Sequence, residues 1–454
     1  MIMSKERNVC EKMAVSIGMV SLGCPKNQVD AEKMLYRLGV KGFETAEDPR
    51  EADIVIINTC GFIQSAKEEA IENILEYLSL KEQGAVKAVI CTGCFAERYR
   101  DDIMKEFTEL DAVVPLGNDG EIAEITERIA KEGQCDLTPR EKYDLPLEGG
   151  RDLIGSRHTA YLKIAEGCSN FCTYCAIPMI RGKFRSRKIE DVLEEARELA
   201  AEGVTELIVV AQDTSRYGED LYGKSRIAEL LKELCRIDGF KWIRTLYMYP
   251  ERLTDEIIDT IADEQKLVKY LDIPIQHCNA QVLRRMNRQG DREWLSALMK
   301  KIRERIPGIT LRTTLITGFP GETGEQFEEL AEFINEVRFD RLGCFAYSEE
   351  EGTPAARMTD QIPVEERQRR AAVIMEQQMF ISDELAEMAV GQQREVLCEG
   401  YDEDMGMFFG RSAADAPDID GMVYFNAEEP PEDGEYVAVT VESAEDGDLF
   451  GTAV

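Results

Sequence analysis

Histidine is scarce in this chain, and long apolar runs are absent from it. Its 454 residues include only two histidines, His158 and His277, which makes zinc sites that combine cysteine with histidine a less favoured explanation for its cysteines. No run of 18 apolar residues occurs, so we expect no membrane span. The first residues, Met1 to Asn8, contain no apolar core before a cleavage site, and we therefore expect no signal peptide.

Positive charge is also in short supply. Lys and Arg number 54 against 88 Asp and Glu, which gives a net charge of -34 at pH 7. Phosphate binding needs lysine and arginine, so this balance argues against bare nucleic acid as a partner. It favours solubility and a basic protein partner, although general acidity explains it equally well. Thirteen cysteines without an export signal indicate reduced thiols and metal ligands in the cytoplasm.

Three of these cysteines form a compact motif. Cys168, Cys172 and Cys175, called here the motif triad, lie within eight residues and directly follow the strand-like segment 161–165. Three thiols cannot complete a four-thiolate site, and on a four-iron cluster they leave one iron open to an outside ligand. An open iron indicates an enzyme rather than a structural metal site. A zinc knuckle is less favoured, because such sites pair two CxxC knuckles or add histidine.

Three further cysteines occupy equivalent places near the start of the chain. Cys24, Cys60 and Cys94, called here the N-terminal triad, each lie just beyond an apolar run, at 15–20, 52–57 and 85–90. Such runs are typical of buried parallel strands. Because the carboxyl ends of parallel strands share one edge of a sheet, we expect these thiols to converge there. The plain alternative is that cysteine is a good small core residue, which is how we interpret Cys91.

The chain divides into four segments by pattern. Residues 13–140 alternate apolar strands with amphipathic helices and predict a doubly wound α/β domain. Residues 141–156 are charged, contain Gly and Pro, and predict a linker. Residues 157–390 contain six strand-then-helix units, which predicts an open (β/α)6 partial barrel with a lateral gap for a macromolecular substrate. Residues 391–454 have short strands between Gly, Asp and Pro turns, which predicts a small antiparallel β-barrel.

Together these features resemble the methylthiotransferase family of the radical S-adenosylmethionine (SAM) superfamily. The CxxxCxxC spacing, with Tyr174 before the third cysteine, is similar to the superfamily signature. Three dispersed cysteines, a radical SAM barrel and a C-terminal TRAM barrel are similar to the family's domain order. The resemblance implies a [4Fe-4S] cluster on each triad, with SAM as cofactor. It also implies that one SAM methylates a sulfur held at the N-terminal triad. A second SAM, cleaved at the motif triad, would give a radical that takes hydrogen from the β-carbon of an aspartate, which then accepts the methylthio group.

Five residues are expected to contact SAM. The resemblance implies that Tyr174 meets the adenine through its backbone. Gln212 and Asp213 follow the second barrel strand and are placed to meet the amino-acid part of SAM. Gln276 follows the fourth strand and Gly318 the fifth, at the carboxyl ends of strands where barrel sites lie. For Gly318 a simple turn is an equally good explanation.

Four basic residues follow the motif triad: Arg181, Lys183, Arg185 and Arg187. They could hold the SAM carboxylate or the target aspartate, but we favour a solvated loop paired with nearby acids. His277, beside one expected SAM contact, is interpreted as a hydrogen-bonded structural residue rather than a ligand.

Local sequences are most similar to the branch of the family that modifies a ribosomal protein. The similar segments are 21–27, 270–277, 345–354 and 410–421. The C-terminal segment adds an independent argument, because residues 391–454 hold 17 acidic residues against Arg394 and Arg411 alone. A TRAM domain that binds RNA should be basic along one face, whereas this one should attract a basic protein. An ordinary solvated acidic surface remains the plain alternative.

The resemblance to this branch implies a reaction that converts an aspartate of small-subunit ribosomal protein twelve to 3-methylthioaspartate. The expected partners are that protein, either free or within the ribosome, and an electron donor such as flavodoxin or ferredoxin, with no membrane and no specific nucleic acid. One rival is a tRNA methylthiotransferase acting on isopentenyl-adenosine, which shares both clusters but predicts a basic C-terminal barrel. Another is a non-catalytic iron–sulfur binding or sensor protein, which explains the clusters but not the six-unit barrel.

Overall fold

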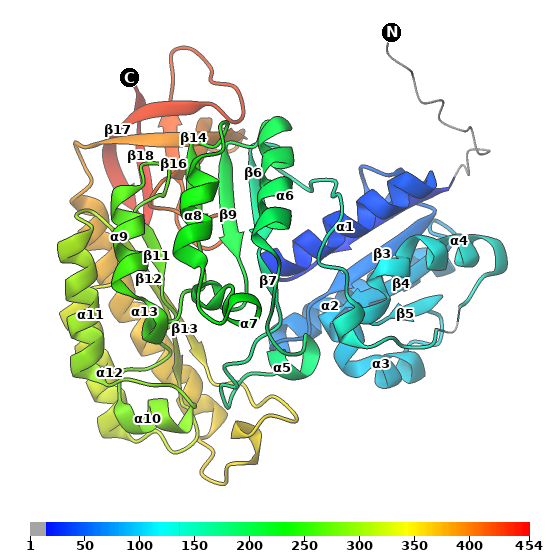
Figure 1. Ribbon diagram of the computed structural model, residues 1–454, viewed down its shortest axis with the longest axis horizontal. Helices are drawn as coiled ribbons and strands as arrows, with labels where there is room; N and C mark the ends of the chain where they lie inside the picture. The colour runs from blue at the N-terminus through cyan, green and yellow to red at the C-terminus, as the bar shows by residue number, and fades with distance from the viewer. Residues whose placement is uncertain (1–14, 136) are drawn as a thin grey trace. The chain divides into compact units, whose positions relative to one another are not determined.

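The computed structural model describes residues 15–135 and 137–454, so residues 13, 14 and 136 of the expected first domain lie outside the described residues. The chain forms two compact units (Figure 1). The N-terminal unit comprises the chain up to Ile154 together with Ile177–Lys183, and the barrel unit comprises Gly155–Ala176 and Phe184–Val454. The short segment that follows the motif triad therefore folds with the N-terminal unit.

The N-terminal unit is built on a parallel sheet in the order β2-β1-β3-β4-β5. Its strands are β1 (Ser16–Ser21), β2 (Glu44–Thr45), β3 (Ile54–Thr59), β4 (Ala88–Gly93) and β5 (Ala112–Val114). The helices are α1 (Pro25–Lys41), α2 (Gln64–Glu82), α3 (Cys94–Glu106) and α4 (Ile122–Glu132). Helices α1 and α4 pack on one face of the sheet, and α2 and α3 pack on the other. This confirms the doubly wound prediction.

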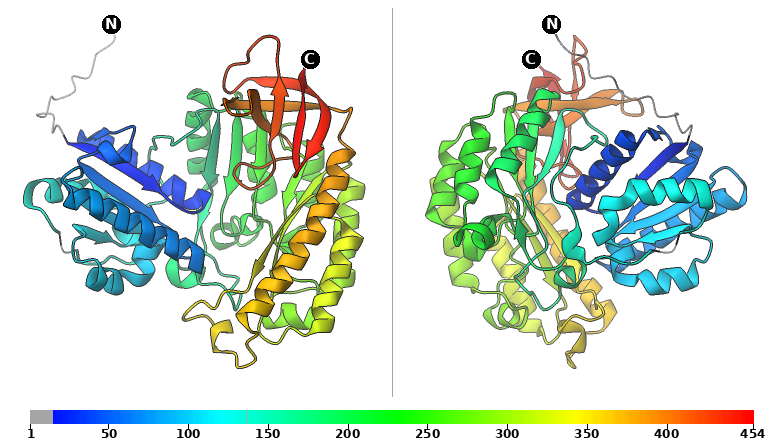
Figure 2. Two further views of the ribbon diagram at one scale, coloured as in Figure 1. Left: turned by 180° about the vertical axis from the view of Figure 1, so that it is seen from behind. Right: turned by 45° about the vertical axis from the view of Figure 1, so that its right-hand side comes forward.

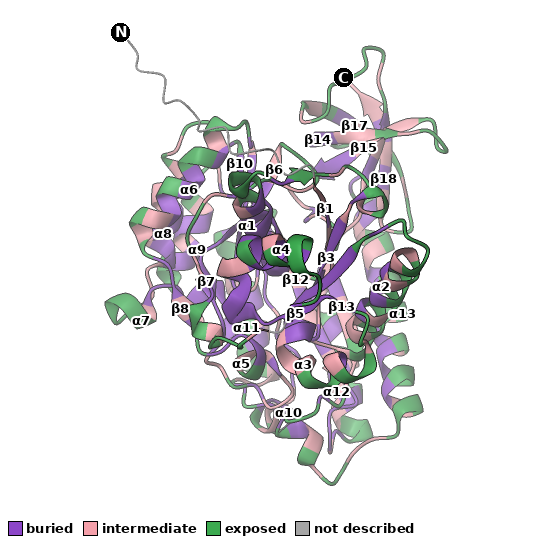
Figure 3. Cartoon of the chain, turned by 90° about the vertical axis from the view of Figure 1, so that its right-hand side faces the viewer, coloured by how far each residue is buried: buried purple, intermediate pink, exposed green. Residues whose placement is uncertain are grey.

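The central strands explain why the sequence forms this sheet. Every residue of β3 and β4 is buried, as expected for parallel strands covered on both faces; β3 is marked as buried in Figure 3. Cys91 lies within β4, is fully buried and packs in the core beneath α2 and α3. Its interpretation as a core residue is confirmed.

The barrel unit contains the six expected parallel strands, in chain order. They are β6 (Thr159–Lys163), β9 (Glu206–Val210), β10 (Trp242–Thr245), β11 (Tyr270–Asp272), β12 (Thr310–Thr317) and β13 (Arg341–Ala346). Two three-stranded ladders are linked by a parallel bridge between Ile243 and Leu267. Among the described residues β6 and β13 do not pair, so the barrel is open, as predicted.

Helices cover the outside of this partial barrel (Figure 2). The longer ones are α6 (Ile189–Ala201), α8 (Ile227–Cys235), α9 (Asp255–Asp263), α11 (Arg292–Arg305), α12 (Gly324–Val337) and α13 (Val364–Glu387). The short elements of the barrel unit are α7 (Glu219–Tyr222), α10 (Ala280–Arg285) and an antiparallel pair of β7 (Ala165–Glu166) with β8 (Arg185–Ser186). The short helix α5 (Ile177–Ile180) belongs to the N-terminal unit. Helix α13 packs along the edge strand β13. No helix in the described part of the chain is long and apolar enough to cross a membrane.

The C-terminal strands close into a small barrel in the order β14-β15-β16-β18-β17. They are β14 (Gln393–Asp402), β15 (Met407–Ser412), β16 (Val423–Asn426), β17 (Tyr436–Glu445) and β18 (Asp448–Ala453). The small barrel is as predicted, but its closure is not purely antiparallel, because β16 and β18 pair in parallel.

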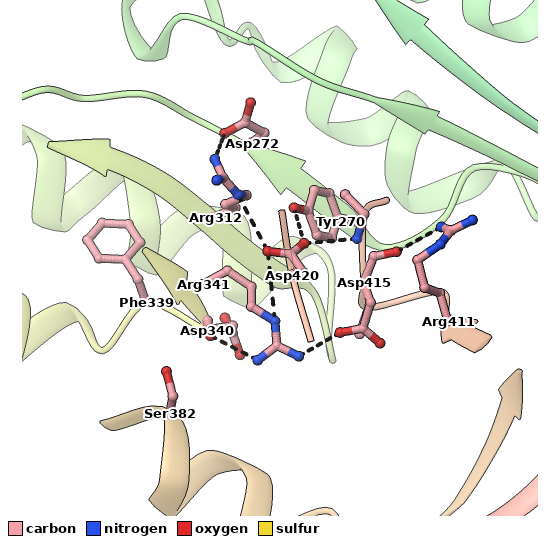
Figure 4. A network of polar contacts seen from close by, with 12 residues as sticks. Tyr270, Asp272, Arg312, Phe339, Asp340, Arg341, Ser382, Arg411, Asp415 and Asp420 are labelled. Atoms are coloured by element: carbon pink, nitrogen blue, oxygen red, sulfur yellow. Dashed lines mark hydrogen bonds and ion pairs between the residues drawn. The ribbon is translucent and has the colours of Figure 1, made fainter. Parts of the chain in front are cut away.

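A buried polar network joins this small barrel to the partial barrel within the same unit (Figure 4). Arg341, at the start of β13, binds Asp415 at 2.6 Å. The hydroxyl of Tyr270, at the start of β11, donates to Asp420 at 2.6 Å. The network thus covers the amino-terminal ends of the barrel strands, the end where residues of such barrels serve stability rather than chemistry.

Candidate metal centres

The motif triad lies in the loop between β7 and α5. Cys168 and Cys172 are about 5 % and 4 % exposed, and Cys175 is half-buried. Burial raises the pKa of the Cys168 thiol to about 12, and the nearby charges of Asp213 and Cys172 act in the same direction. Two of the three thiols are therefore largely shielded from water. A metal centre that supplies positive charge would convert them to the thiolates that ligation requires.

Backbone hydrogen bonds fix the shape of this loop. The Thr173 N–H donates to the Met286 carbonyl at 3.0 Å, and the Thr173 carbonyl accepts from the Ala355 N–H at 2.9 Å. The side-chain amide of Asn287 donates to the backbone carbonyls of Asn170 and Phe171. The loop is thus held from the end of α10 and from the segment after β13.

A buried ion pair supports the start of the motif. Lys163 and Glu166 are 1 % and 0 % exposed and lie 2.9 Å apart. Glu166 also accepts the backbone N–H of Gly167 at 3.0 Å, and Gly167 has a φ of +72°, which glycine adopts at little cost. The sequence interpretation missed this pair. Two opposite charges three residues apart, in an otherwise apolar stretch just before the cysteines, could have revealed it.

Two expected SAM contacts lie directly after β9. Asp213 is fully buried, accepts from the Asn170 amide at 2.8 Å and from the Ser215 hydroxyl, and burial raises its pKa. The Gln212 side-chain oxygen is buried and has no hydrogen-bond partner among the described residues. A buried acceptor without a donor is costly, so this oxygen suits a ligand that donates to it.

The other expected contacts are less distinctive. Gln276 has a φ of +70°, unusual for a residue other than glycine; its N–H donates to the Thr314 carbonyl at 2.9 Å. Gly318 has a φ of +69°, and a Cβ there would lie 2.8 Å from the Arg367 Cα, so packing against α13 already requires glycine. Tyr174 packs partly against a small core that includes Phe319. Contact of these residues with SAM stays a prediction.

An aromatic residue that the sequence interpretation missed faces the motif triad. The Tyr249 hydroxyl lies 3.8 Å from the Cys172 sulfur, close enough for a hydrogen bond to sulfur. The buried Arg288 guanidinium lies over the Tyr249 ring, 4.2 Å from its centroid, and is paired with Glu251 at 2.9 Å.

The N-terminal triad gathers at the carboxyl edge of its sheet. Cys24 immediately precedes α1, Cys60 follows β3, and Cys94 begins α3 directly after β4. A Cβ added to Gly23 would lie 3.0 Å from the Cys60 sulfur. The pKa of Cys60 is raised by burial and by the charge of Cys24, and that of Cys94 is raised by burial to about 12 and feels both other thiols. The structure thus brings the three thiols together, and their role as ligands stays a prediction.

The chemistry of this donor set suits an anionic metal cluster. Burial by itself would raise the pKa of Cys24, but Lys26 and Arg181 outweigh it and hold that pKa below its usual value. Neighbouring cations of this kind favour the thiolate form that metal ligation requires.

The expectation of a solvated loop is wrong for two of the four basic residues after the motif triad, although both of these pair with acids as expected. Arg181 is 1 % exposed and donates to the Cys94 sulfur at 3.2 Å. Arg187 is 2 % exposed and pairs with Glu195 at 2.8 Å. Both guanidinium groups are buried because each finds acceptors in the interior, which local sequence spacing does not reveal.

Comparison with known proteins decides the family. Residues 162–334 match the radical SAM superfamily, residues 16–115 the uncharacterized protein family UPF0004, and residues 390–454 the TRAM domain. The ribosomal protein uS12 methylthiotransferase RimO of Thermoanaerobacter sp. (strain X514) is 47 % identical over 96 % of this chain and 99 % of its own length. That of Lachnoclostridium phytofermentans is 46 % identical over 97 % and 100 %.

The chain belongs to the RimO family. As a RimO family member it is a transferase of the radical SAM superfamily that uses SAM and two [4Fe-4S] clusters. Nothing among the matches favours the tRNA-modifying or non-catalytic alternatives. A solved structure of the radical SAM methyltransferase TsrM from Kitasatospora setae, with cobalamin and a [4Fe-4S] cluster, shares the fold at a TM-score of 0.56 and 14 % identity, covering 84 % of this chain and 81 % of TsrM.

Proposed function

We propose that this chain transfers a methylthio group to the β-carbon of an aspartate in ribosomal protein uS12, giving 3-methylthioaspartate. The observation that carries the proposal is the similarity to RimO proteins over nearly the whole length of both chains. That similarity includes the C-terminal barrel as well as both cysteine-bearing regions. A shared radical SAM region alone would support only the superfamily.

In this proposal the motif triad holds the cluster that binds SAM, and the N-terminal triad holds the second cluster. When bound, the clusters and SAM supply the one-electron chemistry and the methylthio group, which no side chain can provide. The chain's own residues bind and orient. The Lys163–Glu166 pair fixes the start of the cysteine loop. Gln212 and Asp213, at the carboxyl end of β9, offer acceptors to the amino group of SAM.

The substrate is proposed to be recognised by its positive charge. Asp415 and Asp420 of the C-terminal barrel face arginines of the partial barrel, so they are not available to a partner. The connection between β16 and β17 still carries several exposed acids: Glu428, Glu429, Glu432, Asp433 and Glu435. This loop would repel phosphate and attract a lysine- and arginine-rich protein, whether free or in the ribosomal subunit. We place the reaction in the cytoplasm, with flavodoxin or ferredoxin as electron donor.

The proposal is tested in a strain that lacks the gene, complemented with wild type or with Cys24→Ala, Cys168→Ala or Cys91→Ala. Mass spectrometry of uS12 and of tRNA should show a methylthio group on uS12 with wild type and Cys91→Ala, and none with the other two. Cys91→Ala is the matched control because this thiol is buried in the core. Loss of a methylthio group from tRNA, with uS12 unchanged, would contradict the proposed substrate.

Anaerobic iron and sulfide counting on the same purified variants tests the site separately. Cys24→Ala and Cys168→Ala should each remove one four-iron cluster, and Cys91→Ala should remove none. Full iron content in either of the first two would contradict the proposed ligands.

A further inference from the structure

The segment Ile177–Lys183 is built into the N-terminal unit by its own contacts. It forms the single turn α5, whose end is fixed by a hydrogen bond from the Arg181 N–H to the Ile177 carbonyl at 2.8 Å. Lys142 donates to the Met179 carbonyl. The Tyr143 ring lies where a side chain on Gly182 would be, 2.7 Å from an added Cβ. These contacts fix the path of the backbone on both sides of Arg181.

The Arg181 side chain points into the site of the N-terminal triad. Its Nε–H donates to the Cys94 sulfur at 3.2 Å. Its two terminal nitrogens donate to Asp30 at 2.9 Å and to Asn27 at 3.1 Å. Both partners lie on α1, which begins immediately after Cys24. The guanidinium therefore ties one cysteine to the helix that follows another.

Burial of this cation needs a physical reason. Arg181 is 1 % exposed, and arginine stays charged at every relevant pH. A buried charge is costly unless other charges and hydrogen bonds compensate it. Asp30, itself 4 % exposed, supplies one negative charge. Three thiolates on a cluster would add further negative charge beside the same cation. This charge would compensate the cost of burying the Arg181 guanidinium.

We infer that Arg181 is a positioning residue for the second cluster, which orients Cys94 and offsets the negative charge of the bound thiolates. The inference rests on the proposed function, because it takes the N-terminal triad as the cluster ligands. Hydrogen bonds to the sulfurs and the local charge set the reduction potential of an iron–sulfur cluster. A fixed cation stabilises the reduced form, so Arg181 raises the potential of this cluster.

The experiment uses the full chain with Cys168→Ala, so that only the second cluster remains, and compares Arg181→Met, Arg181→Lys and Lys183→Met. The potential is measured by redox titration followed by electron paramagnetic resonance, and cluster retention by the rate of iron loss to a chelator. Arg181→Met should lower the potential and speed iron loss. Arg181→Lys should restore much of the potential. Lys183→Met, which removes an exposed charge two residues away, should change neither.

A second variant separates charge from packing. Asp30→Asn removes the partly compensating negative charge and should raise the potential, opposite in sign to Arg181→Met, whereas a purely structural disturbance would move both in one direction. Asp30 raises the pKa of the buried neighbour Asp119, so its removal would favour ionisation of Asp119, which would replace the lost negative charge. The double variant Asp30→Asn/Asp119→Asn is therefore compared with Asp119→Asn alone. If Arg181→Met loses iron and Arg181→Lys retains it, that result also supports the inference.

Unchanged potential and iron retention in Arg181→Met, or equal shifts in both variants, would overturn it. Adding Cys94→Ala to Cys168→Ala tests the underlying assignment. If that double variant keeps its iron, the proposed ligands are wrong and the inference falls with them; if it loses the iron, the Arg181 and Asp30 results decide the inference alone.

Discussion

Glu206→Gln should destabilise the barrel unit strongly without emptying either iron site. Glu206 is the first residue of β9 and is fully buried. It accepts from Arg244 at 3.0 Å and from Arg411, on β15, at 2.7 Å. Burial would raise the pKa of Glu206, but Arg411 and Arg244 outweigh it and lower that pKa. The carboxylate is therefore charged at neutral pH and joins the small barrel to the partial barrel.

The size of the effect follows from these contacts. Each attraction is about 4 kcal/mol at an effective dielectric constant of about 20, and desolvation of the carboxylate, which glutamine avoids, offsets several kcal/mol of the total. In the variant, Arg411 still pairs with Glu399 at 2.6 Å, and Arg244 still donates to the carbonyls of Ser412 and Ala413. We therefore expect a loss of about 3–5 kcal/mol in the free energy of unfolding, the usual cost of removing one partner of a buried pair.

Urea unfolding followed by tryptophan fluorescence measures this directly. The chain has two tryptophans, and Trp242 packs edge-on against Tyr436 of β17, 4.8 Å between ring centroids. With Trp294→Phe as background, the signal reports the junction of the two barrels. Glu395→Gln is the matched control, because Glu395 forms an exposed pair with Lys241 at 2.6 Å and should cost under about 1 kcal/mol. If the two substitutions cost the same, the buried network does not hold the barrels together.

Three further predictions concern the barrel unit. Glu166→Gln should speed iron loss from the motif triad, measured with a chelator in a Cys24→Ala background, because the Lys163 charge and the Gly167 N–H lose their shared carboxylate; an unchanged rate would contradict that role. Tyr249→Phe in the same background should lower the potential of the remaining cluster, since a donor 3.8 Å from a ligand sulfur is removed; an equal or higher potential would contradict it. Burial lowers the pKa of His277 to about 3, below the unfolded value of about 6.5. The stability that the neutral, buried His277 contributes is therefore present above about pH 6.5 and is lost as pH falls toward 3, by up to about 1.4 kcal/mol per pH unit. Urea unfolding of wild type and His277→Gln measures this difference in the free energy of unfolding; a difference independent of pH would rule it out.

The gathering of the N-terminal triad could be predicted because it depends only on topology. A thiol that follows a continuous apolar run is placed at the carboxyl edge of a parallel sheet whatever its neighbours are. Cys91, three residues before Cys94, could be assigned to the core by the same argument. The six barrel strands were predictable for a similar reason, since each is a short apolar run followed by a helical pattern.

Contacts between distant segments could not be predicted in this way. Arg181 and Asp30 are 151 residues apart, and the spacing of basic residues near Arg181 is also that of an ordinary solvated loop. In the small barrel the sequence pattern indicates strands only at 394–399, 422–426 and 435–441, so it misses β15 and β18. The parallel pairing of β16 with β18 depends on how the small barrel closes. No local pattern specifies such closure, because its partners are set by the rest of the fold.

The acidic residues of the C-terminal barrel fall into two groups, one that stabilises the fold and one that faces a partner. Its net charge therefore overestimates the negative charge that a partner can contact. Asp420 lies 3.5 Å from the Arg312 guanidinium, and Asp415 lies 2.6 Å from that of Arg341; these acids are buried and contribute to stability. The charges of the exposed acids between β16 and β17 are screened by salt. They affect the rate at which a partner associates. Neutralising the buried acids should therefore lower stability at any ionic strength. Neutralising Glu428 and Glu429 should instead slow association with a basic protein, and most strongly at low salt.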